Sequence, residues 1–377
     1  MHKRLVAALL AAATLSTPAS ALKIELLDAG GVSEPTAQYK AFRKAADYWE
    51  AMISTDTTVR IDTYFYGQGD DAPIGSTTNY YYVDNVKTIL GAMANVASGS
   101  AIDQTAIANL PDASSGSIGM WTPGYTDPVN KTGADPFTKI YDNDGSNNNA
   151  SYGVTWALGK ALGLVTVDDL KDGSILFNSS LNFDFDPTDG IAAGSYDFTF
   201  TAFHEIGHIL GFTSGVDYYD TWAPSDGYDW NLDWIGHGAD IFRYSQDGLD
   251  WSLGGNPFFS IDGGASALLG GAFSTGQNWG NGQQASHWLE GLGIMDPTAA
   301  KGEMGTLTAL DLAMFDALGW NLRVDPLANP NLRVTTAEMF AAGGGAVPEP
   351  ASWAMMIGGF ALVGAGLRKR RVAVSFG

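Results

Sequence analysis

The sequence predicts an α+β fold in which one central helix lies between a mixed-sheet subdomain and an irregular subdomain. Residues 22–212 alternate segments of helical apolar spacing with segments of alternating apolar and polar residues, a pattern typical of helices packed on a sheet. Residues 203–210 carry an apolar stripe at helical spacing, and Gly211 follows where a helix ends. Residues 213–337 are rich in Gly, Asp and Trp, so we expect them to form the irregular subdomain.

The elements of the first subdomain follow one another in a recognisable order. Residues 33–53 begin with Ser-Glu-Pro and then repeat apolar residues at helical spacing, which predicts a helix. Residues 59–65 alternate between apolar and polar and predict a half-buried strand. A Gly- and Asp-rich loop over 67–75 precedes a helix expected over 83–94, and a further helix is expected over 156–164.

Two more elements flank the central helix. Residues 181–186 alternate Leu and Phe with Asn and Asp, which predicts a strand. That strand could be an edge along which an extended substrate pairs, or an ordinary sheet strand; both interpretations stay open. Near the end, Thr308 and Asp311 suit the first turn of a helix that Gly319 closes.

The central helix contains His204-Glu205-Ile206-Gly207-His208. Residues four apart lie on one face of a helix, so both imidazoles could bind one Zn²⁺. The carboxylate of Glu205 would then stand beside the water that such an ion activates. The alternative is a core helix whose histidines only satisfy buried hydrogen bonds, although the whole chain has only five histidines.

A catalytic zinc ion takes a third protein ligand and leaves one position for water. Three residues after the helix could supply it: Asp217 close behind, His237 in a glycine-rich setting, and His287 beside Trp288. Imidazole suits zinc better than a lone carboxylate. The residues alone leave these candidates open, together with the possibility that no third ligand exists.

The segment around His287 resembles a known family. His-Glu-x-x-His-x-x-Gly-Phe over 204–212, a long insertion, His-Trp at 287–288, Met-Asp-Pro at 295–297 and a helix ending in Leu-Gly-Trp at 318–320 are similar to the leishmanolysin branch of the metzincins. The resemblance spans roughly residues 197–320. It implies a zincin fold and peptide-bond hydrolysis.

Residue by residue, the resemblance implies that His204, His208 and His287 are the zinc ligands and that Glu205 is the general base. It also implies that Met295 forms a turn beneath the metal.

The chain departs from that family in several ways. Ser214 stands where the compact metzincin spacing has its third histidine. The chain contains no cysteine, which excludes disulfides and thiolate ligands, and no lipid-anchor signal is visible. It also resembles bacterial metalloproteases with a PEP-CTERM tail, through Phe-Arg-Tyr-Ser at 242–245 and Phe-Ser-Ile-Asp-Gly-Gly at 259–264.

Both ends of the chain carry patterns typical of export signals. Residues 1–21 have a basic start, an apolar run and an Ala-Ser-Ala cleavage site, which predicts a secretory signal peptide. The metalloprotease domain would then occupy 22–337, with subdomains 22–212 and 213–337, followed by a Gly-rich linker over 338–346.

Residues 347–377 complete the chain with a three-part tail. Pro348, Glu349 and Pro350 precede an apolar run over 354–367 and four basic residues over 368–371. This tail resembles the PEP-CTERM sorting signal of Gram-negative bacteria, which implies processing by an exosortase. The apolar run is short for a bilayer span, so we expect transient inner-membrane association before release to the cell surface or the medium.

The formal charge of the chain between the predicted signal peptide and the sorting tail is strongly negative. Of 20 basic residues, two lie in the leader and four in the tail, so residues 22–350 carry 14 basic against 41 acidic residues, a formal charge of −27. Such a surface repels nucleic acid, which we exclude as a partner.

Acidic loops suggest a further cofactor. Asp142 and Asp144, and separately Asp184, Asp186 and Asp189, could supply oxygen ligands to Ca²⁺, or they could simply be solvated.

The sequence therefore predicts an exported zinc endopeptidase that acts on proteins or peptides. Two alternatives are a non-catalytic surface or matrix protein on a zincin scaffold, and a hydrolase of non-peptide amides.

Overall fold

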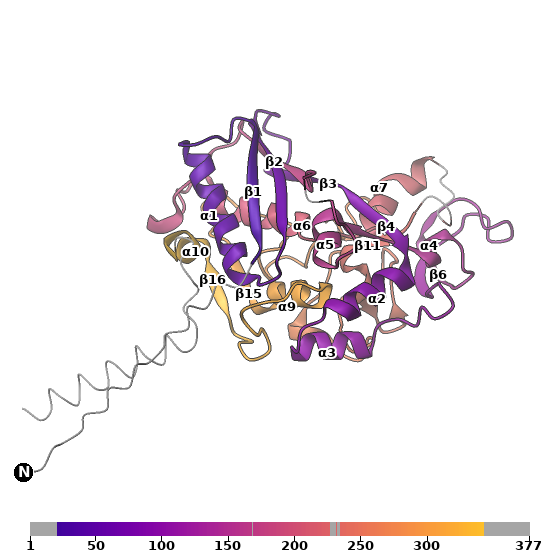
Figure 1. Ribbon diagram of the computed structural model, residues 1–377. Helices are drawn as coiled ribbons and strands as arrows, with labels where there is room; N and C mark the ends of the chain where they lie inside the picture. The colour runs from indigo at the N-terminus through magenta and orange to yellow at the C-terminus, as the bar shows by residue number, and fades with distance from the viewer. Residues whose placement is uncertain (1–20, 168, 227–230, 232–233, 343–377) are drawn as a thin grey trace, which may run out of the picture.

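The computed structural model describes residues 21–342 apart from 168, 227–230 and 232–233, and it shows a mixed α+β fold with several small sheets (Figure 1). The expected signal peptide, apart from Ala21, and the sorting tail lie outside the described residues. Within the described residues, no helix combines the length and the apolar character that crossing a membrane requires.

A four-stranded sheet with two helices on one face forms the first layer. Its strands and helices are β1 (Lys23–Gly30), α1 (Ala37–Met52), β2 (Thr58–Tyr66), β3 (Gly75–Asn79), β8 (Gly173–Asn178) and α6 (Phe198–Ile209). The strand order is β1-β2-β8-β3, in which β3 alone runs antiparallel to its neighbour. This arrangement leaves β3 at an edge of the sheet.

Aromatic side chains join α1 and α6 to each other and to this sheet. Phe177 of β8 contacts both Phe42 of α1, at 5.1 Å between ring centroids, and Phe198 of α6, at 4.4 Å. Trp49 stacks on Phe203 at 4.3 Å and donates its indole hydrogen to the Phe203 carbonyl. Because one side chain of a strand faces one side of a sheet, both helices cover the same face.

The remaining N-terminal elements complete this half. They are β4 (Tyr81–Asn85), α2 (Val86–Val96), α3 (Ala101–Ala108), β5 (Met120–Gly124), β6 (Asp135–Asp142), α4 (Asn147–Ala150), β7 (Ser151–Thr155), α5 (Trp156–Ala161), β9 (Phe183–Asp184), the 3₁₀ turn η1 (Pro187–Asp189) and β10 (Tyr196–Asp197).

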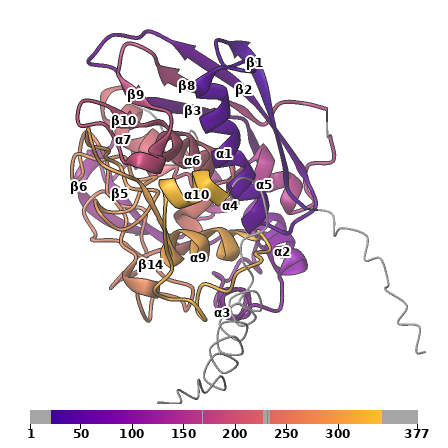
Figure 2. The same ribbon diagram turned by 90° about the vertical axis from the view of Figure 1, so that its left-hand side faces the viewer.

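Loops and short elements dominate after Gly211, as expected. The elements are α7 (Val216–Asp226), β11 (Gly236–His237), η2 (Gly238–Phe242), β12 (Arg243–Ser245), β13 (Gly248–Leu249), β14 (Phe258–Phe259), η3 (Leu268–Gly270), β15 (Thr306–Thr308), α9 (Ala309–Leu318), β16 (Arg333–Thr335) and α10 (Thr336–Ala342). Two views related by a quarter turn both place α9 below α6 (Figures 1 and 2).

Most expected helices and one strand are confirmed. The helix over 33–53 is α1, the strand over 59–65 is β2, and the closing helix is α9. Thr308 and Asp311 cap α9 reciprocally, and Gly319 ends it at φ 110°. The helix over 156–164 is shorter than expected and ends at Ala161.

One expected helix and one expected strand have bounds that differ from those in the structure. The helix over 83–94 starts only at Val86, because β3 and β4 occupy the preceding residues. The strand over 181–186 shrinks to β9, which pairs with β10 outside the main sheet. Phe183 in β9 and Phe185 just after it both pack on Phe198 at the start of α6.

Candidate metal centre

Helix α6 brings two histidines and a glutamate to the floor of a cleft. Asp197 caps the helix by accepting a hydrogen bond from the backbone N–H of Phe200 at 2.9 Å. The same carboxylate accepts hydrogen bonds from Gly305 and Thr336 of the C-terminal half. Every residue of α6 is buried, so the histidine-bearing helix runs through the core and is tied at its start to both halves.

His287 joins His204 and His208 from an irregular segment 79 residues farther along the chain. The three Nε2 atoms lie 3.1 Å (His204 to His287), 3.1 Å (His204 to His208) and 3.2 Å (His208 to His287) apart. None of the three histidines is more than 9% exposed. A tetrahedral zinc with bonds of about 2.0–2.1 Å holds its nitrogen ligands about 3.3 Å apart, so the spacing suits such an ion.

The other nitrogen of each ring fixes which atoms carry protons. Nδ1 of His204 faces the carbonyl of Ile294 at 2.9 Å, Nδ1 of His208 faces that of Phe212 at 2.7 Å, and Nδ1 of His287 faces that of Gln284 at 3.3 Å. A carbonyl oxygen only accepts, so each Nδ1 holds the proton and each neutral ring turns a lone pair inward. Three lone pairs then converge at about 3 Å, a repulsive arrangement that a bound cation relieves.

The histidines are held in the neutral form that metal binding needs. Burial lowers the pKa of His204 to about 4 and that of His208 to about 3, and it lowers the pKa of His287 well below its usual range. The neighbouring imidazoles add to the effect on His208 and His287. Neutral imidazoles are therefore present at neutral pH without any need to release protons.

The side chain of Glu205 extends from α6 to the edge strand β3. Its carboxylate accepts a hydrogen bond of 2.7 Å from the hydroxyl of Thr77 on β3. Burial raises the pKa of Glu205 to about 7, and the Thr77 hydrogen bond acts in the opposite direction. A Cβ at Gly75 would lie 2.7 Å from Glu205 Oε1, so the close approach of β3 to the carboxylate requires glycine there.

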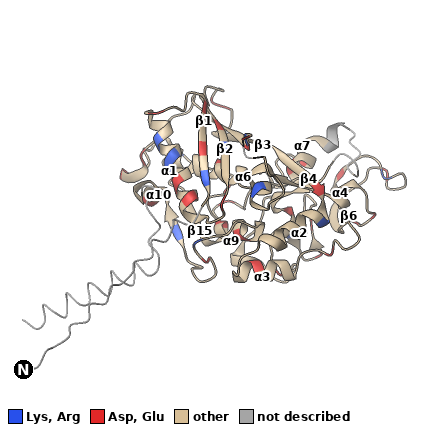
Figure 3. Cartoon of the chain, in the orientation of Figure 1, with Lys and Arg blue, Asp and Glu red and all other residues tan. Residues whose placement is uncertain are grey.

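The cleft around these groups has a volume of about 620 Å³. Its lining includes residues of β3 and the two residues before it, Asp296 to Ala299, and Tyr81, Tyr218 and His237. No Lys or Arg lines it among the described residues. Asp and Glu outnumber Lys and Arg in the sequence, and Figure 3 shows where these residues lie along the described chain. The cleft thus combines polar, acidic and apolar residues and has no cationic side chain among the described residues.

Met295 lies directly beneath the histidine helix. It is fully buried, and a Cβ at Gly207 would stand 2.5 Å from its sulfur. Asp311, at the start of α9, accepts hydrogen bonds from the backbone of Ile294 at 3.0 Å and of Met295 at 3.2 Å. The Asp311 carboxylate also accepts the indole hydrogen of Trp288 at 3.0 Å. The turn and the residue after His287 therefore share one buried anchor.

The other candidate ligands do not reach the histidine cluster. Among the described residues, His204, His208 and His287 form the one group of three or more metal-ligating side chains close enough to share an ion. His237 lines the same cleft, but its Nδ1 lies 3.1 Å from the hydroxyl of Thr213. The Asp217 carboxylate accepts backbone hydrogen bonds from the segment that carries His287.

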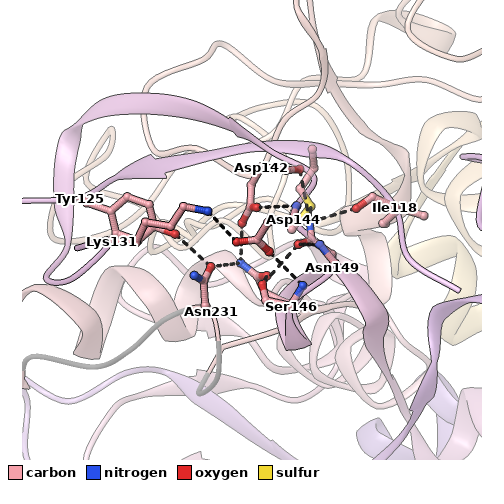
Figure 4. A network of polar contacts seen from close by, with 11 residues as sticks. Ile118, Tyr125, Lys131, Asp142, Asp144, Ser146, Asn149 and Asn231 are labelled. Carbon is pink, nitrogen blue, oxygen red and sulfur yellow. Dashed lines mark hydrogen bonds and ion pairs between the residues drawn. The ribbon is translucent and has the colours of Figure 1, made fainter. Parts of the chain in front are cut away.

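Four of the five candidate carboxylates in the acidic loops have partners within the protein. Asp144 pairs with Lys131 at 3.0 Å, and Asn148 donates to Asp142 at 2.9 Å (Figure 4). The carboxylates of Asp184 and Asp186 accept backbone N–H groups of their own loops. Lys131 already supplies a cation to the first loop, and calcium binding stays a prediction without further support.

Two residues of the site had no role in the sequence analysis. Thr77 and Gly75 belong to a polar edge strand that shows little apolar alternation, so no periodic signal pointed to them. The capping pattern did identify Asp311, but only as a helix start.

Comparison with known proteins identifies the tail. Residues 346–371 match the family described as the PEP-CTERM protein-sorting motif, which covers Pro348, Glu349 and Pro350. The chain is therefore an exported protein of the Gram-negative type, with a C-terminus that exosortase-type enzymes recognise. No curated protein and no solved structure matches the chain.

Proposed function

We propose that this exported protein is a zinc-dependent endopeptidase. The observation that carries the proposal is the convergence of three imidazole lone pairs within about 3.2 Å of one another beside a buried glutamate. His204, His208 and His287 would hold one Zn²⁺ and leave a fourth position facing the cleft. Zinc so held supplies Lewis acidity and lowers the pKa of water to near neutrality.

Glu205 is positioned to move the proton in this reaction. It lines the cleft beside the histidines, and its pKa of about 7 without metal falls when a divalent cation is bound nearby. The ionised carboxylate takes a proton from the attacking water at one of its oxygens and delivers it to the leaving amine. Thr77 keeps the carboxylate oriented throughout by donating to Oε2.

The edge strand supports a peptide as the substrate. β3 pairs with β8 on one side and is the last strand of its sheet, and its residues Gly75 to Thr77 line the cleft. An extended chain can add to such an edge through main-chain hydrogen bonds, independently of its sequence. We assign the role of substrate-pairing edge to β3. The sequence analysis had considered the strand over 181–186 for this role.

The leishmanolysin-like metzincin identity is part of this proposal. Support comes from Met295 under Gly207 and from a third histidine that arrives after a long insertion. The tail supports export through the inner membrane, with release after transient anchoring, although its apolar run lies outside the described residues.

Zinc analysis and casein hydrolysis by the purified protein test the proposal. We expect one zinc per chain, cleavage of casein, loss of both with a chelator, and recovery when zinc is restored. Full zinc occupancy without hydrolysis of any unfolded protein would favour the non-catalytic scaffold. Hydrolysis of small amides with no cleavage in a peptide library would favour the non-peptide hydrolase.

A further inference from the structure

His287 belongs to neither a helix nor a longer strand, so its position needs another source of rigidity. The two other histidines are fixed by the backbone hydrogen bonds of α6. Residues 284–288 contain only an isolated bridge between Trp288 and Phe273. A ligand on such a segment would lose conformational entropy on binding a metal, which weakens the metal affinity.

Two charged side chains, the half-buried Asp217 and the buried Arg243, hold the residues just before His287. The carboxylate of Asp217 accepts two consecutive backbone N–H groups, from Ala285 at 2.5 Å and from Ser286 at 3.0 Å. The guanidinium of Arg243 donates to the carbonyl of Ala285 at 3.3 Å and to that of Ser274 at 2.8 Å. Ala285 is therefore held through both its N–H and its carbonyl.

Ser274 extends this support past the histidine. Its backbone N–H donates to the carbonyl of His287 at 3.0 Å, and its hydroxyl donates to the carbonyl of Trp288 at 2.8 Å. Since Arg243 also holds the carbonyl of Ser274, the guanidinium joins the two chain segments that run beside each other at the site.

The placement of these charges is costly without such a role. Arg243 is 1% exposed, and its Nε has no hydrogen-bond partner among the described residues. A buried guanidinium pays a large desolvation penalty, which the negative charges of Asp240, Asp217 and Asp250 reduce. Asp217 stands in the first turn of α7, where the positive end of the helix dipole favours a carboxylate.

We infer that Asp217 and Arg243 are positioning residues that clamp the segment 285–287 and thereby preorganise His287 for the metal. This inference rests on the proposed zinc site. It assigns Asp217, a candidate ligand in the sequence, a role behind the ligand, and it gives Arg243 of the Phe-Arg-Tyr-Ser motif a function.

Asp217→Asn tests the clamp because the amide keeps the shape but turns one acceptor into a donor. One of the two backbone N–H groups then faces an N–H group. We expect the zinc dissociation constant, measured by chelator competition, to rise about ten- to a hundredfold. We also expect faster amide exchange at Ala285 and Ser286, with unchanged exchange in α6 and an unchanged circular dichroism spectrum.

Asp220→Asn is a matched control on the same helix. Asp220 is 1% exposed and accepts two consecutive backbone N–H groups, from Asn278 and Trp279, both at 2.8 Å. Neither of these hydrogen bonds involves residues 285–287. We expect faster exchange around residue 278 and an unchanged zinc dissociation constant.

Two results would overturn the clamp: unchanged zinc affinity in Asp217→Asn, or equal weakening in both variants. The wild-type protein provides a test even where the Asp217 variant does not fold, because without metal its Ala285 and Ser286 amides should exchange as slowly as those of α6. Fast exchange there would contradict the clamp. A wild-type protein that binds no zinc would instead defeat the proposed function, and the exchange measurement would still decide whether Asp217 holds the segment.

Discussion

The two halves of the molecule position the proposed metal ligands by different physical means. In the regular half, one helix sets His204 and His208 one turn apart, and its own backbone hydrogen bonds keep them there. In the irregular half, side chains from distant positions hold the segment around His287: Asp217 accepts the backbone N–H groups of Ala285 and Ser286, and Asp311 accepts the indole hydrogen of Trp288. We therefore expect a loop to present a side chain as firmly as a helix when carboxylates that accept backbone N–H groups take the place of regular hydrogen bonds.

Removal of the ligand from the irregular half is expected to have the largest effect. His287→Ala leaves two imidazoles, too few for a stable catalytic zinc site. Zinc content should fall to near zero and casein hydrolysis should disappear, as measured by metal analysis and peptide release.

His237→Ala is the control for that change, since His237 lines the same cleft without joining the cluster. It should leave the zinc content unchanged. Loss of zinc in His237→Ala together with retention in His287→Ala would reverse the ligand assignment and break the comparison between the halves.

In the proposed reaction, the regular half also contributes the proton-transferring group, Glu205. Glu205→Gln keeps the size of the side chain and its contact with Thr77 but cannot take a proton. We expect kcat to fall about 10²- to 10⁴-fold while zinc content stays at the wild-type level. Loss of zinc from this variant would show that Glu205 holds the site together structurally.

What the sequence could predict follows the same division. The periodicity of a helix is visible in consecutive residues, so the spacing of His204 and His208 was enough to place both on one face. His287 could be singled out only through its resemblance to a family, by its neighbour Trp288 and by Met295. Asp217 looked like a ligand because sequence spacing does not show that its carboxylate accepts the N–H groups of residues 68 and 69 positions away.

The edge strand escaped prediction for a related reason. Gly75 to Asn79 read Gly-Ser-Thr-Thr-Asn, with no large apolar residue to reveal a period of two. The strand forms because β8 pairs with it along its whole length, and β8 is distant in the sequence. Stability of that kind comes from tertiary pairing, which local patterns do not encode.

The smallest expected effect concerns how this edge strand tunes the base on the helix. The Thr77 hydroxyl donates to the charged form of Glu205 and so lowers its pKa. In Thr77→Val that pKa rises, the base stays protonated to a higher pH, and the acidic limb of kcat/KM moves upward. A hydrogen bond worth about 1 kcal/mol corresponds to a three- to tenfold loss of kcat/KM on the acidic limb, with little loss on the plateau where Glu205 is ionised in both proteins. Thr78→Val, on the exposed face of the same strand, should leave the profile in place. An equal loss at every pH in Thr77→Val would mean that the hydroxyl orients the substrate or the strand and does not tune the base, and the edge strand would then belong with the binding surface alone.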